Sequence, residues 1–199
     1  LVYILELVSS TLEVKLFWDD MQWVGTAVAP VATLMFALIF SGHKPARLRR
    51  TWALLLLPSV IFLLLVATNT WHGLTRANAM LVPGERFSLL VYDFTPAVYA
   101  AAIYLYALML AAFYFLARLF INSQRIFRSQ ITAVFLGLLI PVIGSIVALA
   151  DITLAEQRDM TPLTFAIGNL IVAWGLFRHR LFDVAPVAWE TVVTNLQDA

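Results

Sequence analysis

Five long stretches without acidic or basic residues dominate the amino-acid sequence. They cover residues 21–42, 51–75, 94–117, 129–150 and 160–177, and each is rich in Leu, Ile, Val, Ala and Phe. A helix needs about 20 mostly apolar residues to cross the hydrocarbon layer of a bilayer. The period-two alternation that is typical of a membrane β-barrel is absent from these stretches. They therefore predict an all-α fold, a polytopic bundle of transmembrane helices.

Composition agrees with a membrane protein and excludes several other classes. Hydrophobic residues make up 62% of the 199 positions and charged residues 13%, whereas a soluble domain carries about 45–50% and about 25%. One soluble core of this size cannot enclose such an excess. The net charge of +1 provides no basic field for nucleic acid. The lack of Cys excludes disulfides, thiolate metal sites and thiol nucleophiles.

The loops between the stretches differ in charge. The basic loops are 43–50, 118–128 and 178–180, and the acidic or nearly balanced loops are 11–20, 75–92 and 151–159. Lys and Arg accumulate in cytoplasmic loops, so we expect a multi-pass protein of the cell membrane with a cytoplasmic C-terminus. Residues 1–10 look like the end of a further helix, and we expect the chain to be part of a longer one.

We divide the chain into a membrane bundle, residues 1–183, and a connector helix, residues 184–199. The expected spans are 1–10 (partial), 19–42, 51–74, 93–117, 130–150 and 161–178. The connector has Pro186 where a first helical turn would begin, and its apolar residues recur at three- and four-residue steps. It leads to a cytoplasmic domain or lies on the bilayer surface. Each complete span also carries a proline inside it or near its outer end, which indicates either tolerated helix prolines or hinge points.

The few polar groups of the spans gather toward the outer ends of the helices. Asn69 and His72 lie three residues apart, which places them on one face of helix 51–74. Polar residues within a membrane are costly and are therefore candidates for function. They suggest a pocket open to the exterior, with these candidate ligand contacts: Glu6, Trp18, Asn69, His72, Asp93 and Tyr99. The alternatives are interfacial anchoring for the aromatic residues and interhelical hydrogen bonds for the polar ones.

Several kinds of membrane chemistry are excluded by missing residues. A retinal Schiff base needs a lysine within the bundle, but Lys15 and Lys44 lie in or beside loops. A bis-histidine haem is excluded because only His72 lies within a span. Hydrolase, metalloprotease and phosphate-loop motifs are also missing. We therefore expect no catalytic residue, no metal and no cofactor in this chain.

A set of short motifs runs in order along the whole chain. They are Glu6 with Ser9 and Ser10, the segment Lys15–Trp18, Thr68-Asn69 with His72, Tyr99, Pro141, Asp159 with Thr161-Pro162, and Arg178–Asp183 with Pro186. In order and spacing they resemble the N-terminal seven-transmembrane sensor region of bacterial and archaeal histidine kinases, a region also found on diguanylate cyclases. Relative to that family the first helix and half of the second are missing. The chain would then hold a partial second helix plus five complete spans.

The resemblance implies a membrane-embedded sensory input module. Such a module binds a small or membrane-soluble ligand on the outer side and relays the signal through its C-terminal helix. The resemblance further implies PAS, kinase or cyclase output domains in the same protein, and a homodimer in the lipid bilayer. Two alternatives stay open. One is a transporter or channel component, which the apolar inner halves of the helices disfavour, and the other is a passive membrane anchor for a cytoplasmic enzyme.

Overall fold

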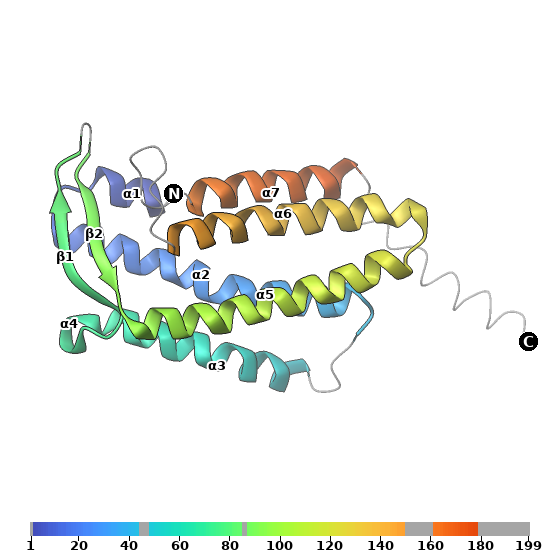
Figure 1. Ribbon diagram of the computed structural model, residues 1–199, viewed down its shortest axis with the longest axis horizontal. Helices are drawn as coiled ribbons and strands as arrows, with labels where there is room; N and C mark the ends of the chain where they lie inside the picture. The colour runs from blue at the N-terminus through green and yellow to red at the C-terminus, as the bar shows by residue number, and fades with distance from the viewer. Residues whose placement is uncertain (1, 44–47, 85–86, 150–160, 179–199) are drawn as a thin grey trace, which may run out of the picture. The chain divides into compact units, whose positions relative to one another are not determined.

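The computed structural model describes residues 2–43, 48–84, 87–149 and 161–178 of the chain (Figure 1). In chain order the elements are α1 (Val2–Val8), α2 (Leu12–Phe40), α3 (Leu48–Ala67), α4 (Asn69–His72), β1 (Arg76–Val82), β2 (Leu89–Phe94), α5 (Pro96–Asn122), α6 (Arg125–Leu149) and α7 (Thr161–Arg178). The chain divides into two compact units between Ala117 and Arg118, near the end of α5. The first unit holds α1 to α4, both strands and most of α5, and the second holds α6 and α7.

Long apolar helices confirm the expected all-α membrane bundle. Helices α2, α3 and α5 are each long and apolar enough to cross a membrane. Within the described residues, α6 and α7 carry the shorter apolar stretches Ile131–Val147 and Leu163–Gly175. A perpendicular span needs about 20 residues. The sequence predicted five complete spans, whereas three helices reach membrane length in the described part of the chain.

Apolar side chains from α2, α3 and α5 form the core of the first unit. The buried residues that the three helices share are Ala27, Phe62, Val66 and Val98. Two hydrogen bonds join the same helices. The Ser59 hydroxyl of α3 donates to the Ala27 carbonyl of α2 at 2.8 Å, and the Tyr104 hydroxyl of α5 donates to the Leu55 carbonyl of α3 at 2.6 Å. Hydroxyl groups inside a membrane bundle stabilise helix packing in this way because the lipid offers them no partner.

The segment expected as a connection over residues 75–92 folds as a β-hairpin instead. Strands β1 and β2 pair antiparallel, and the register shifts between Ala77 and Met80. Asn78 lies in this shift with a left-handed backbone (φ 54°), a conformation that Asn tolerates better than most residues. Its side chain donates to Asp93 at 2.9 Å. The pairing satisfies backbone groups along both segments, so β2 continues to Phe94 and helix α5 begins at Pro96 rather than at residue 93.

Helix α3 ends at Ala67, whereas the sequence predicted a continuous helix to residue 74. The Thr68 hydroxyl donates to the Leu64 carbonyl at 2.6 Å, a local bond of the kind that competes with helix continuation. Gly73 then closes the short helix α4, with φ 60° and its N–H donated to the Asn69 carbonyl at 2.8 Å. Asn69 and His72 therefore lie on α4, outside the long helix that was expected to carry them.

The two helices of the second unit pack closely against each other along faces of small residues. Gly137 and Gly144 of α6 and Gly168 and Gly175 of α7 are all buried, and a Cβ added at any of the four would meet atoms of the other helix. Helix α7 covers the expected span 161–178. The predicted connector helix over residues 184–199 lies outside the described residues.

Candidate functional site

One face of α2 carries the centre of a polar cluster. Lys15, Asp19 and Gln22 follow one another at steps of four and three residues, which places them on the same face of the helix. Helix α2 begins at Leu12, so most of the expected loop over residues 11–20 is helical. Figure 1 shows this first part of α2 beside α1 and the β-hairpin. The polar face of α2 therefore meets partners from segments on both sides of it in the chain.

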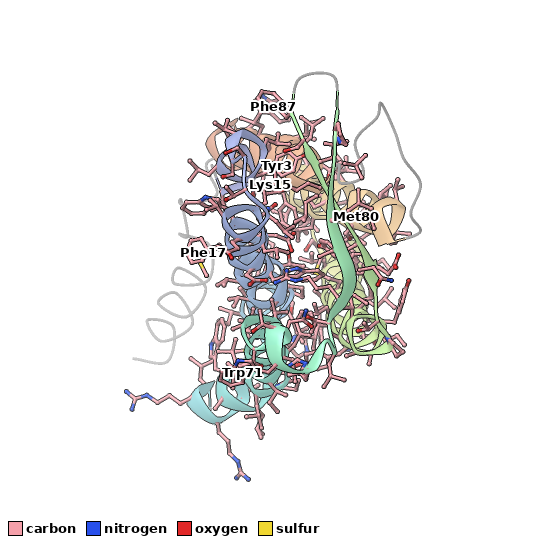
Figure 2. All side chains as sticks on the ribbon, turned by 90° about the vertical axis from the view of Figure 1, so that its left-hand side faces the viewer. Tyr3, Lys15, Phe17, Trp71, Met80 and Phe87 are labelled. Atoms are coloured by element: carbon pink, nitrogen blue, oxygen red, sulfur yellow. The ribbon has the colours of Figure 1, made fainter. Side chains whose placement is uncertain are left out.

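Lys15 and Gln22 connect α2 to α1. Lys15 is fully buried, whereas Phe17 two residues later is exposed (Figure 2). The Lys15 ammonium donates to the carbonyl oxygens of Glu6 at 2.7 Å and Leu7 at 3.2 Å. These carbonyls belong to the last turn of α1, where helix carbonyls lack intrahelical partners and a positive charge is favourable. The Gln22 amide donates to the Glu6 carboxylate at 2.9 Å, so Glu6 is held through both its backbone and its side chain.

Arg76 connects the hairpin to α2. It is buried at the start of β1, and its guanidinium reaches the Asp19 carboxylate at 2.8 Å and the Asp20 carboxylate at 2.5 Å. The Tyr92 hydroxyl of β2 donates to the two Asp19 oxygens at 3.1 and 3.2 Å. The Arg76 guanidinium also lies 5.9 Å from the centroid of the Tyr92 ring. Both strands are thereby bound to the same carboxylate by charge-assisted hydrogen bonds, which are the stronger kind.

Asn69 fixes the backbone that carries Arg76. Its side-chain oxygen accepts from the Thr75 N–H at 2.8 Å, the Thr75 hydroxyl at 2.9 Å and the Arg76 N–H at 3.3 Å. Its amide nitrogen donates to the Arg76 carbonyl at 3.1 Å. Thr95 closes the other side of the hairpin base, because its hydroxyl donates to the Leu74 carbonyl. One amide side chain on α4 therefore determines where β1 begins.

His72 closes the turn between α4 and β1. The Leu74 N–H donates to His72 Nδ1 at 2.9 Å, so in this arrangement the proton of a neutral ring is on Nε2. That nitrogen lies 3.0 Å from the Thr68 hydroxyl oxygen, which can accept from it while the same hydroxyl donates to Leu64. Trp71, one residue before His72, is 86% exposed. His72 thus stabilises the turn, and the Trp71 side chain lies on the surface.

Aromatic rings extend from the cluster toward the helical core. Phe94, at the end of β2, meets Tyr92, Trp23 and Tyr99 edge-on, with ring centroids 5.6, 6.2 and 6.4 Å apart respectively. Trp23 in turn contacts Phe62 of the core at 5.3 Å. Such edge-to-face pairs add to the stabilisation from burial alone. The chain of rings connects the residue that binds Asp19 with helices α3 and α5.

The six candidate residues from the sequence have different immediate partners. Glu6 bonds to Gln22, Asn69 to Thr75 and Arg76, His72 to Thr68 and Leu74, and Asp93 to Asn78, while Trp18 packs on Phe17 and Tyr99 on Phe94. Asn69 bonds directly to the backbone of Arg76, whereas Tyr99 is connected to Asp19 through Phe94 and Tyr92. Lys15 and Arg76 occupy the centre of the cluster, although neither was among the candidate ligand contacts from the sequence. The four- and three-residue spacing of Lys15, Asp19 and Gln22 was a signal for Lys15, but it does not point to Arg76.

The described residues contain no group of three or more His, Cys, Asp or Glu side chains placed to hold a metal ion. The cluster combines the carboxylates of Glu6, Asp19 and Asp20 with the cations of Lys15 and Arg76. Its contacts are ion pairs and hydrogen bonds between separate chain segments. This arrangement can hold α1, α2 and the hairpin together, and it can respond to a change at any of them.

Comparison with known proteins identifies the family. The model of the N-terminal 7TM region of histidine kinases matches residues 1–186 of the chain, a range that contains every described helix and strand and the whole polar cluster. A search of curated proteins found no match, and neither did a search of solved structures. The chain therefore belongs to the family of N-terminal seven-transmembrane regions of histidine kinases.

Proposed function

We propose that this chain is the sensory input module of a membrane-bound histidine kinase, with its receiving end at the β-hairpin. Membership of the family supports a sensory role. The observation that carries the proposal is the bridge from Arg76 of the hairpin to Asp19 and Asp20 of α2. A surface segment is tied by this bridge to a helix of membrane length. A change in the hairpin would therefore move α2 as well.

In this proposal the hairpin end faces the exterior and the C-terminus faces the cytoplasm. The support is the distribution of Lys and Arg, which concentrate in the loops at the opposite ends of the helices. The signal would leave through α7 and the connector over residues 184–199. Output would come from PAS, kinase or cyclase domains that follow, in a homodimer.

The ligand contacts we propose are the six residues named from the sequence: Glu6, Trp18, Asn69, His72, Asp93 and Tyr99. Asn69 holds the backbone of Arg76, so a ligand bound there would act directly on the bridge. Asp93 and Tyr99 flank Phe94, whose ring contacts Tyr92. A ligand shifts a conformational equilibrium only through different affinity for the two states, and a bridge that can be made or broken would provide those states.

Autophosphorylation of the full-length kinase in proteoliposomes tests the proposal. We expect Arg76→Gln to change the basal phosphorylation rate, because the hairpin is no longer held to α2. The matched control is Arg49→Gln, an exposed arginine at the start of α3, which should leave the rate unchanged. If the bundle can be replaced by unrelated spans with no change in output, the chain is a passive anchor. Solute flux through the reconstituted bundle would favour the transporter alternative.

The ligand site has its own test in thermal unfolding of the purified chain in nanodiscs. A panel of amines, carboxylic acids and short-chain lipids provides the probes. A compound that raises the unfolding temperature of the wild type should raise that of His72→Ala less, while Thr70→Ala, which changes an exposed neighbour on the same short helix, should respond as the wild type does. Equal stabilisation of all three proteins would remove His72 from the proposed site.

A further inference from the structure

In the first unit, helices α2 and α3 each contain an internal proline. Pro30 lies within α2 and Pro58 within α3. Because proline has no N–H, the carbonyl four residues before it loses its usual helical partner, and the proline ring also presses against that carbonyl. In α2 this carbonyl belongs to Thr26, and in α3 it belongs to Leu54. Each helix is therefore weakened at the turn that precedes its proline, and turns of this kind are where helices bend.

Hydrogen bonds from neighbouring helices end at both weakened turns. The Ser59 hydroxyl of α3 donates to the Ala27 carbonyl, which lies three residues before the proline of α2. The Tyr104 hydroxyl of α5 donates to the Leu55 carbonyl, which lies three residues before the proline of α3. The acceptor thus has the same position relative to the proline in both helices. A hydroxyl from a neighbouring helix supports each turn that proline has weakened, as hydroxyl groups do in membrane helices.

Ser59 connects the two turns in series. It follows Pro58 directly, so the turn of α3 that accepts from Tyr104 is next to the residue that donates to α2. Ser59 and its acceptor residue Ala27 are both buried, and lipid offers the hydroxyl no replacement partner. Helices α5, α3 and α2 are therefore joined one after the other by two hydroxyl bonds. A change in the bend at one proline turn alters the support of the other.

The series lies one short step away from the polar cluster at the hairpin. Ala27 follows Asp19, the partner of Arg76, by eight residues in α2. Tyr104 lies eight residues after the start of α5, and Ser59 lies eight residues before the end of α3. At 1.5 Å per residue, each of these steps is about 12 Å along its helix. The three helices that meet the hairpin at their ends are thus joined again by the hydroxyl bonds at a common distance from it.

We propose that Ser59 and Tyr104 are positioning residues that couple the bends of α2 and α3 at their proline turns, and so carry a displacement of the hairpin along the bundle. In one state both hydroxyl bonds are made, and in the other they are released and each turn bends separately. The prolines of α2 and α3 then act as hinge points rather than as tolerated residues. This inference deepens the proposed function and rests on it for the origin of the signal at the hairpin.

Distances between two spin labels on the chain in nanodiscs test the coupling. The sequence contains no Cys, so Ile39→Cys on α2 and Leu110→Cys on α5, both at exposed positions, take up the only labels. Arg76→Gln releases the hairpin from α2 and should change the ratio of the distance populations. Tyr104→Phe keeps the ring and removes the oxygen. In its presence the ratio should respond to Arg76→Gln about three-fold to sixteen-fold less, the range for one interhelical hydrogen bond in a membrane.

Further variants separate the hydroxyl bonds from general packing. Ser59→Ala should weaken the response to Arg76→Gln as Tyr104→Phe does, and Ser59→Thr, which keeps a hydroxyl, should restore it. The matched control is Tyr114→Phe, which removes an exposed hydroxyl of the same helix as Tyr104 and should leave the response unchanged. A response to Arg76→Gln that is equally large in all these backgrounds, or absent from all of them, would overturn the proposal.

Autophosphorylation of the full-length kinase with the same substitutions distinguishes this inference from the proposed function. We expect Arg76→Gln to change the phosphorylation rate less when Tyr104→Phe is also present. If Arg76→Gln changes the rate equally with and without Tyr104→Phe, the coupling is refuted and the proposed function stands. If the label distances respond as expected while the phosphorylation rate does not change, the coupling stands and the proposed function fails.

Discussion

Arg76 at the start of β1 and Asp19 on α2 form a buried ion pair 2.8 Å long, although 57 residues separate them in the chain. The pair is 8% exposed on the arginine side and 15% on the aspartate side. The Tyr92 hydroxyl donates to Asp19, and the Asp20 carboxylate forms a second ion pair with Arg76. This contact joins the β-hairpin to the helical part of the first unit, and it is the centre of the candidate site.

Breaking this pair should destabilise the first unit strongly. Arg76→Gln leaves two carboxylates without their cation in a largely buried place, which typically costs about 3–5 kcal/mol. Thermal unfolding in nanodiscs, followed by circular dichroism, measures the loss. Arg49→Gln at an exposed site should stay within about 0.5 kcal/mol of the wild type. A similar small effect for Arg76→Gln would mean that the hairpin is not held by this contact.

Asn69 should stabilise the base of the hairpin against local unfolding. Asn69→Ala removes one donated and three accepted hydrogen bonds, and buried groups left unpaired cost about 1–3 kcal/mol. Hydrogen exchange of residues 74–82 and 89–95 should become faster, with little change in α2 and α3. Asn69→Asp keeps the accepting oxygen and should restore part of the protection. Exchange at the wild-type rate in Asn69→Ala would exclude this role.

Lys15 should determine whether α1 stays attached to α2. Lys15→Met preserves the aliphatic stem and removes two charge-assisted bonds to the Glu6 and Leu7 carbonyls, with an expected loss of about 1.5–3 kcal/mol per bond to a charged group. The amides of residues 3–9 should exchange faster. Glu13→Gln, an exposed change on the same helix, serves as the control. Protection of α1 that survives Lys15→Met would refute the attachment.

Replacing Gly168 or Gly25 by alanine should change the free energy of unfolding in opposite directions. Gly168→Ala places a Cβ against the Gly137 carbonyl oxygen, and such overpacking costs about 1–3 kcal/mol. Gly25→Ala in α2 meets no atom within 4 Å and should stabilise its helix by up to about 1 kcal/mol, because Ala is the better helix former. Thermal unfolding of both variants checks the pair. Equal effects would contradict the close approach of α6 and α7.

The long helices could be predicted because their signal is local. Twenty or more consecutive apolar residues in α2, α3 and α5 indicate membrane helices whatever the rest of the chain does. The hairpin was missed because the balanced charges of residues 75–92 are equally typical of a loop, and because Tyr92 and Asp93 directly precede the charge-free stretch of α5. The end of α3 at Ala67 was also missed. It depends on one Thr68 hydroxyl bond and on Gly73, signals that are weak beside a hydrophobic run.

The candidate site was predicted in part. Glu6 and Asn69 were recognised as polar residues in a costly environment, and both lie in the cluster or support it. Lys15 and Arg76 were overlooked because a charged residue near a span end ordinarily reaches water. In the structure both are buried by partners from other segments, which no local pattern reveals.

The sequence by itself determined the class of the protein, a helical membrane bundle, because the cost of placing residues in a bilayer is nearly additive along the chain. Only the tertiary structure decided which charges pair. The Arg76–Asp19 contact and the attachment of α1 through Lys15 arise from segments that approach each other after the chain has folded. Their energies depend on burial and on exact distances, and neither quantity is encoded by residue type alone.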